Sequence, residues 1–387
     1  MTRVEAKLCK RIRDLPERDW DRLAAFPDGT VQPFVRHAFL KALEDSGCVG
    51  GRTGWNPVHV SIEVEGELAA VAPLYIKAHS YGEYVFDHSW ADAYQRSGRR
   101  YYPKLLCAVP FTPVTGPRLL CGGDEGLEAA LISATESAAQ QLGVSSVHIN
   151  FPSEDVWSRL GARGLLQRQD QQFHFENKGY QCFADFLGEL QSIKRKNLRR
   201  ERAQAFQAGI TIEWVTGSDI REVHWDAFYD FYMDTGSRKW GAPYLNREFF
   251  SRVGGVMADQ ILLILAKRDG RYIAGALNFM DATTLYGRNW GAIEHHPFLH
   301  FEVCYYQAID FAIAKGLKRV EAGAQGAHKL ARGYLPSATY SLHWIADPDF
   351  RDAIARYLAQ ERDAVTDEMT GLQEHAPFRR DLEREQE

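Results

Sequence analysis

The 387-residue chain lacks the features that mark several broad classes of protein. No run approaches the ~20 apolar residues that a membrane-spanning helix needs, and the polar start at residues 1–7 has no signal-peptide core. The six cysteines form no C-x-x-C pair and no cysteine–histidine cluster at zinc spacing. We therefore expect a cytoplasmic protein with free thiols, no metal site and no membrane span.

The chain also lacks an excess of positive charge. Its formal net charge of −5 gives no overall electrostatic reason to bind nucleic acid or a membrane. Hydrophobic residues make up 45% and charged residues 25%, which is an ordinary globular composition. A chain of this length is too long for a single hydrophobic core, so the sequence predicts two domains of roughly 150–200 residues each.

The first half of the chain shows an ordered series of predicted strands. Residues 58–64 alternate apolar and polar side chains, as a half-buried strand does. A turn at 65–67 and an apolar run at 68–76 follow, and a third strand is predicted at 84–86. This series predicts a sheet that begins with a hairpin.

The second half repeats this order. A strand is predicted at 261–266, a turn with an Asp-Gly pair at 268–271, a returning strand at 272–280 and a third strand at 284–286. The same order in two places favours an internal duplication.

Both series continue with a helix and then a strand. One face of a helix is apolar over 127–142 and over 301–315, and these helices are predicted to stop at Gly143 and Gly316. Strands are predicted at 146–151 and 319–322. The first half differs mainly by an insert at about 92–125, which is rich in proline, glycine and aromatic residues. Five matched elements therefore support the duplication.

We predict a fold of the α/β (α+β) class, in which each domain is a mixed, mostly antiparallel sheet flanked by helices. The first domain spans 1–178 and includes the insert. The second spans 179–346 and opens with a basic helix around 193–202. Residues 347–387 form a charged, helical C-terminal tail.

Four motifs carry a family resemblance: residues 86–92 (Phe-Asp-His-Ser-Trp-Ala-Asp), 109–118 (Val-Pro-Phe-Thr-Pro-Val-Thr-Gly-Pro-Arg), 300–306 (His-Phe-Glu-Val-Cys-Tyr-Tyr) and 321–329 (Glu-Ala-Gly-Ala-Gln-Gly-Ala-His-Lys). With the tandem arrangement, they resemble the bacterial FemAB-like (FemABX-related) predicted N-acyltransferases, a peptidoglycan biosynthesis/recognition-type branch of the GNAT superfamily. The resemblance implies tandem GNAT-type acyl-CoA N-acyltransferase domains. It also implies an enzyme that moves an acyl or aminoacyl group onto an amine.

The resemblance leaves two donors open. Fem-type relatives take amino acids from aminoacyl-tRNA, whereas other GNAT enzymes hold acyl-CoA with a Q/R-x-x-G-x-G/A loop at a helix N-terminus. Residues 291–297 lack that glycine spacing, and the negative net charge counts against tRNA. We expect no tightly bound cofactor, acyl-CoA or aminoacyl-tRNA as co-substrate, and a small-molecule amine or peptide-like acceptor.

Three residues of the second half are candidates for the chemistry. Amide formation from an ester or thioester needs a route for the amine proton and donors for the oxyanion. Glu321 is either the base or a surface carboxylate paired with Lys318 or Arg319. His300 is either a proton carrier or a helix cap, and Glu302 is either catalytic or a first-turn residue that complements the helix dipole.

Further polar, cationic and aromatic residues of the second half are candidates for substrate binding: Arg238, Trp240, Arg288, Asn289, Trp290, Gln325, His328, Lys329 and Arg332. A similar group in the first half consists of Asp87, His88, Trp90, Asp92, Tyr102 and Lys104. The alternative for the first half is a degenerate copy that only packs against the second.

The basic run at 194–202 either holds tRNA phosphates or is a solvated helix face. For the whole chain, the alternative to an enzyme is a non-catalytic protein that binds a ligand or cell-wall precursor.

Overall fold

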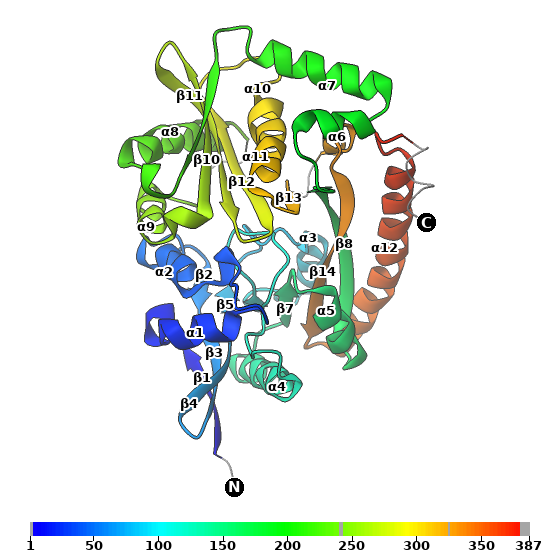
Figure 1. Ribbon diagram of the computed structural model, residues 1–387. Coiled ribbons are helices and arrows are strands. Elements are labelled where there is room, and N and C mark those ends of the chain that lie inside the picture. The colour runs from blue at the N-terminus through cyan, green and yellow to red at the C-terminus, as the bar shows by residue number, and fades with distance from the viewer. Residues whose placement is uncertain (1–2, 240–242, 324–325, 380–387) are drawn as a thin grey trace. The chain divides into compact units, whose positions relative to one another are not determined.

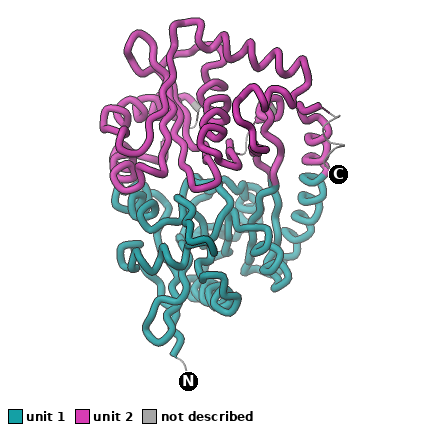
Figure 2. Tube along the Cα trace, viewed as in Figure 1, with its two compact units in different colours: residues 1–170, 338–366 teal, residues 171–337, 367–387 magenta. Residues whose placement is uncertain are grey.

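The computed structural model describes residues 3–239, 243–323 and 326–379, and the chain forms two compact units (Figure 2). Unit 1 consists of Met1–Asp170 and Ala338–Thr366, and unit 2 of Gln171–Ser337 and Asp367–Glu387. The predicted α/β class is confirmed. In the described part of the chain, no helix is both long and apolar enough to cross a bilayer.

The sheet of unit 2 begins as an antiparallel meander, continues with a parallel pair and is completed by an antiparallel strand (Figure 1). Its strands, in spatial order, are β9 (Thr211–Thr216), β10 (Ile261–Arg268), β11 (Arg271–Met280), β12 (Thr284–Ala292), β13 (Arg319–Glu321) and residues 171–176 of β8 (Leu166–Glu176). β12 and β13 are the parallel pair. The tight turn between β10 and β11 has positive φ at Asp269 and Gly270, as the predicted Asp-Gly turn requires.

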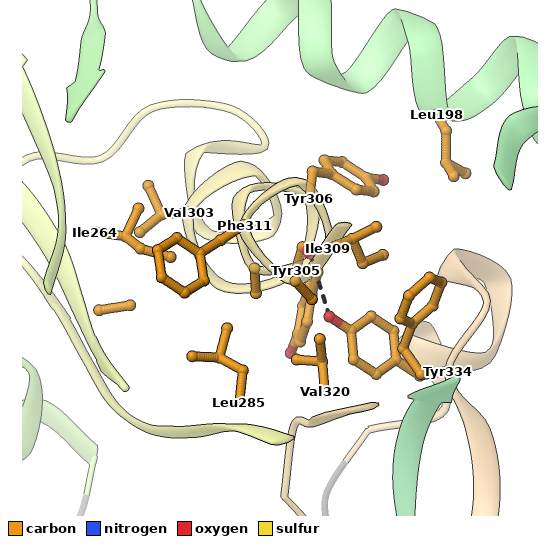
Figure 3. Close-up of a cluster of buried hydrophobic side chains, with 14 of the residues drawn as sticks. Leu198, Ile264, Leu285, Val303, Tyr305, Tyr306, Ile309, Phe311, Val320 and Tyr334 are labelled. Atoms are coloured by element: carbon orange, nitrogen blue, oxygen red, sulfur yellow. Dashed lines mark hydrogen bonds between the residues drawn. The ribbon is translucent and has the colours of Figure 1, made fainter. Parts of the chain in front are cut away.

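Helices cover both faces of this sheet. α8 (Glu222–Lys239) packs on one face, where the backbone of Phe231 lies so close to Gly291 of β12 that a Cβ there would clash. The other face carries a continuous crossover helix, which consists of α10 (Leu299–Phe301), a π-helical turn (Glu302–Tyr306) and α11 (Gln307–Lys315). Figure 3 shows its apolar residues packed among those of the strands, with a hydrogen bond from the Tyr334 hydroxyl to the Tyr305 carbonyl.

Unit 1 contains a similar parallel pair, β6 (Lys104–Cys107) and β7 (Ser146–Asn150), joined by α4 (Glu125–Leu142). The Asp124 side chain caps α4, and the helix ends at Gly143 in the left-handed conformation, as predicted. The strands of its main sheet, in spatial order, are β2 (Trp55–Pro57), β5 (Leu74–Lys77), β6 (Lys104–Cys107), β7 (Ser146–Asn150) and residues 341–345 of β14 (Leu335–Ile345). A separate three-stranded sheet contains β1 (Val4–Cys9), β3 (His59–Val64) and β4 (Glu67–Ala72).

The predicted third strand of the first half is wrong. Residues 84–86 are irregular, because Tyr84 has a positive φ of 58° that breaks an extended chain. The residues that follow begin helix α3 (His88–Arg96) rather than a strand. The strand that corresponds to β12 is β6, which lies inside the stretch assigned to an insert. The apolar run at 68–76 is also two strands, β4 and β5, separated by Pro73.

Each unit completes its sheet with a strand from another part of the chain. Unit 1 takes a strand from late in the sequence, and unit 2 takes one that precedes its other strands. In unit 1, β7 pairs antiparallel with β14, which follows β13 in sequence. In unit 2, β13 pairs antiparallel with β8, which follows β7 in sequence. α12 (Pro348–Glu374) follows β14 in the sequence; its first part belongs to unit 1 and its last part to unit 2. The sheets are thus built from non-contiguous segments, which element order alone did not reveal.

Candidate active site in unit 2

The site begins where the two parallel strands of unit 2 stop pairing. β12 and β13 share only three positions, and the last of these joins Tyr286 to Glu321. β13 ends at Glu321, whereas β12 continues to Ala292. Crevices at the carboxyl ends of parallel strands are the usual ligand sites of open α/β sheets. This position makes Glu321 a candidate site residue.

Glu321 is buried without a hydrogen-bonding partner for one of its oxygens. Directly opposite it on β8 lies His174, whose Nε2 is 3.9 Å from Glu321 Oε2. Within the described residues, neither this oxygen nor either nitrogen of His174 has a hydrogen-bond partner. Buried polar atoms are rarely left in this state, so they need a functional or solvent partner.

Burial sets the charges of this pair. It raises the pKa of Glu321 to about 8, although the guanidinium groups of Arg319 and Arg288 act in the opposite direction. Burial likewise lowers the pKa of His174 to about 3. Near neutral pH the pair is therefore a neutral imidazole beside a carboxyl group that is mostly protonated and partly ionised.

Lys329 lies against the end of the same strand. Its ammonium group donates hydrogen bonds to the carbonyl oxygens of Ala322 and Gly323, at 2.6 and 2.8 Å. These two residues directly follow Glu321. Burial lowers the pKa of Lys329 to about 8. Lys329 is thus a second group with a pKa near neutrality, held by the two residues that follow Glu321.

A β-bulge shapes the opposite strand. Asn278 of β11 pairs with Gly287 and Leu277 pairs with Asn289, which leaves Arg288 as an extra residue in β12. A bulge redirects side chains and commonly occurs beside active sites. A Cβ at Gly287 would lie 3.2 Å from the carbonyl oxygen of Glu321, so a glycine allows this close approach.

Aromatic side chains gather at the start of the crossover helix. His300 lies between Trp290 and Tyr305, with ring centroids 5.1 and 5.5 Å away. His328 stacks on Phe301 at 5.4 Å, and its Nε2 is 3.0 Å from the hydroxyl of Tyr305. The structure therefore brings together three predicted site residues: Trp290, His300 and His328.

Two other predicted residues already have strong partners. Glu302 is fully buried and accepts hydrogen bonds from Arg202 at 2.8 and 3.1 Å and from Gln307 at 2.8 Å. Burial raises the pKa of Glu302. Arg332 pairs with Glu201 at 2.8 Å and lies 3.5 Å above the ring of Phe301. These contacts fasten the π-helical turn and its surroundings, so both residues hold the frame of the site.

The remaining predicted residues of the second half lie apart from Glu321 or outside the described residues. Arg238 is exposed and contacts Asp234 and the carbonyl oxygen of Ala292. Trp240 and Gln325 lie outside the described residues. No group of three or more His, Cys, Asp or Glu side chains within the described ranges is arranged to hold a metal ion.

The candidates of the first half separate into a buried group and an exposed group. Lys104 is fully buried and donates to Glu83 at 2.7 Å and to Ser80 at 2.8 Å, and it also pairs with Asp87. Asp87 accepts a further hydrogen bond of 2.6 Å from Tyr101. Trp90 is buried, Tyr102 is half-buried and bonded to Ser80, and His88 and Asp92 are exposed.

Two histidines that sequence reasoning missed complete the buried group of unit 1. His148 on β7 faces His343 on β14, and their Nδ1 atoms are 2.7 Å apart. Burial lowers the pKa of His148 to about 3 and that of His343 well below its ordinary value. It raises the pKa of Glu83 to about 7. His148 alternates with apolar residues in the strand predicted at 146–151, and His343 does so in β14, for which no strand was predicted. Period-two alternation is the signal that could have found both.

A family model for FemAB-like proteins, described as peptidoglycan biosynthesis/recognition, matches residues 11–380. The chain belongs to the FemAB-like family. The resemblance inferred from its motifs is thus confirmed. A comparison of this FemAB-like chain with curated proteins found no match.

Solved structures with the same fold are distant in sequence. The crystal structure of FemX is 13% identical, with a TM-score of 0.54 over 88% of this chain and 98% of its own. L-PGS from Bacillus licheniformis is 10% identical, with a TM-score of 0.51 over 83% of this chain and 96% of its own. A tandem GNAT protein from the clavulanic acid biosynthesis pathway is 11% identical, with a TM-score of 0.48 over 89% and 99%. At these identities, FemX and L-PGS show the fold of the FemAB-like chain.

Proposed function

We propose that this FemAB-like protein is an N-acyltransferase, which moves an acyl or aminoacyl group from an activated donor to an amine. The observation that carries this proposal is the buried Glu321 at the end of β13, with a carboxyl oxygen that has no partner. A group with a pKa near 8 suits proton transfer to and from an amine at neutral pH. Family membership supports the same reaction class.

In the proposed reaction, the amine nitrogen attacks the carbonyl carbon of the donor and Glu321 takes the amine proton. The bond from carbonyl carbon to the leaving oxygen or sulfur then breaks, and the proton passes to the leaving group. Lys329 is the nearby cation that would stabilise negative charge on the carbonyl oxygen. The aromatic group around His300 would hold the donor or the acceptor.

Two donor classes, acyl-CoA and aminoacyl-tRNA, fit this reaction, and the acceptor is a small amine or a peptide-like amine. A thermal-shift screen of acyl-CoAs, uncharged tRNA and cell-wall precursors would identify the ligand. A ligand at 100 times its Kd should stabilise the protein by about 2.7 kcal/mol. A shift with CoA compounds alone would select the first donor class, and a shift with tRNA alone would select the second.

Mass spectrometry of acceptor amines incubated with the donor then tests turnover. We expect Glu321→Gln to lower the rate by about 10²–10⁴-fold, the range typical of a lost general base. His300→Ala is expected to weaken binding with a smaller loss of rate. Ligand binding without any turnover would instead support the non-catalytic alternative, a protein that binds a cell-wall precursor. Unchanged turnover in both variants would overturn the site assignment.

A further inference from the structure

Helix α7 (Ser192–Ala205) of unit 2, at the top of Figure 1, has an inner face that contacts the rest of the unit. Leu198 is buried in the core of the unit. Arg202 forms ion pairs with Glu302 at 2.8 Å and Asp310 at 2.6 Å, and Glu201 pairs with Arg332. The charges on the inner face are therefore matched by opposite charges of the unit.

The outer face of α7 is different. It carries three exposed cations that form no ion pair or side-chain hydrogen bond with any residue in the described ranges: Lys196, Arg199 and Arg200. Lys194 and Arg195, which are half-buried, likewise form none with a described residue. Cations elsewhere on unit 2 commonly have acidic partners; Arg247, for example, pairs with Glu222 at 2.5 Å. A concentrated positive surface thus stands on a chain with a net charge of −5.

An apolar side chain lies within this positive surface. Ile193 is 72% exposed, the largest value among the exposed large hydrophobic side chains of the described residues. Ile193, Lys196 and Arg200 follow one another at i, i+3 and i+7, so they form one stripe of the helix. Exposing this side chain to water has a cost that burial in an apolar environment would remove.

We infer that the outer face of α7 docks on an anionic lipid surface. Lys and Arg clusters on a helix are attracted to acidic headgroups, and an apolar residue among them gains by entering the headgroup boundary. An RNA partner would use the cations but not Ile193. The helix also carries no aromatic residue that would stack on bases. The combination of charge and an exposed isoleucine therefore favours the lipid surface.

The test is sedimentation of the full chain with vesicles of phosphatidylglycerol and phosphatidylcholine, compared with phosphatidylcholine alone. We expect binding only to the anionic vesicles, with a strong decrease as salt is raised. The triple variant K196E/R199E/R200E should lower the partition coefficient at least tenfold. Ile193→Ser should lower it severalfold at unchanged charge. Melting temperatures would confirm that both variants fold.

A matched control reverses three exposed cations of unit 1 that likewise form no side-chain ion pair with a described residue: Lys10, Arg18 and Arg52. The variant K10E/R18E/R52E has the same net charge as the α7 variant and should bind vesicles as the natural chain does. An equal loss in both triple variants would overturn the proposal. So would absence of vesicle binding by the natural chain, or binding to duplex RNA alone that is insensitive to Ile193→Ser. If the α7 triple variant did not fold, Ile193→Ser would still decide.

Discussion

The two units place ionisable side chains at corresponding positions, but they satisfy them differently. In both units the strand that follows the crossover helix carries an apolar residue toward that helix, Val147 on β7 and Val320 on β13. The neighbouring residue then faces the other side of the sheet. In unit 1 this neighbour is His148, opposite His343; in unit 2 it is Glu321, opposite His174.

The difference lies in the partners. His148 and His343 are bonded to each other, and the adjacent Lys104 bonds to Glu83 and Asp87. One oxygen of each of these carboxylates has no hydrogen-bond partner among the described residues, but the other is held by Lys104. Glu321 and His174 are 3.9 Å apart, and no hydrogen bond is formed. A buried ionic network with partners contributes to a defined core, whereas unpartnered groups are available to a reactant. We propose from this comparison that the corresponding position is structural in unit 1 and takes part in the reaction in unit 2.

The largest effect should come from removing the central cation of unit 1. Lys104→Met leaves Asp87 buried without its ion pair and Glu83 with only the more distant Lys77, at 3.8 Å, which should lower the free energy of unfolding by about 3–5 kcal/mol. Lys329→Met in unit 2 leaves only two backbone carbonyls and should cost about 1–3 kcal/mol. Urea unfolding measures both variants. A larger loss for Lys329→Met would reverse the assigned roles.

A second pair of variants separates the two buried glutamates of unit 2. Glu302→Gln weakens charge-assisted hydrogen bonds to Arg202 and should destabilise the protein by about 1–3 kcal/mol. Glu321→Gln removes a carboxyl group whose Oε2 accepts no hydrogen bond and should have little effect, or increase stability at pH 8. Chemical unfolding at pH 8 tests this order. Similar losses in both variants would show that Glu321 has a structural partner.

The pH dependence of the same variant sharpens this prediction. The pKa of Glu321 is about 8 when folded, above its unfolded value, so the folded state binds the extra proton. Its contribution to stability is therefore present at low pH and is lost as pH rises from about 5 to 8. The stability of the natural chain relative to Glu321→Gln should fall by about 1–3 kcal/mol over that range. A difference that is constant with pH would contradict the raised pKa.

The smallest effects should be equal in the two units. The helices α4 and α11 end at Gly143 and Gly316, with φ values of 62° and 65°, and no neighbouring atom lies within 4 Å of the place that a Cβ would take at either glycine. Alanine at either position has space but adopts a strained conformation, so each variant should lose about 1 kcal/mol. Thermal unfolding of Gly143→Ala and Gly316→Ala checks this equivalence. A clear difference between the two would show that the helix ends are not equivalent.

Sequence periodicity predicted the elements with strong local signals. The helix with its stop at Gly143 and the hairpin at Asp269–Gly270 are formed as predicted, because their turns and apolar faces are local. The strand predicted at 84–86 failed because Tyr84 adopts a positive φ and the neighbouring Glu83 bonds to Lys104. A contact across twenty-one residues is not visible in local alternation.

The candidate site was predictable in part for the same reason. Glu321 stood out as a carboxylate between apolar residues of a short strand. His174 was missed because β8 pairs with β13 across a long separation in sequence. The pairing of Glu302 with Arg202 was likewise invisible, since α7 and the crossover helix lie 100 residues apart. The sequence thus singled out Glu321 at the end of its strand, whereas its neighbour His174 and the partner of Glu302 are visible only in the fold.

The most direct test of the central claim compares the same substitution in the two units. Glu321→Gln and Glu83→Gln each replace a buried carboxylate whose pKa is raised by burial. Single-turnover transfer to the amine acceptor should fall at least 100-fold in Glu321→Gln and stay within threefold of the natural rate in folded Glu83→Gln. Equal rates in the two variants, or loss only in Glu83→Gln, would contradict a reactive unit 2 and a structural unit 1.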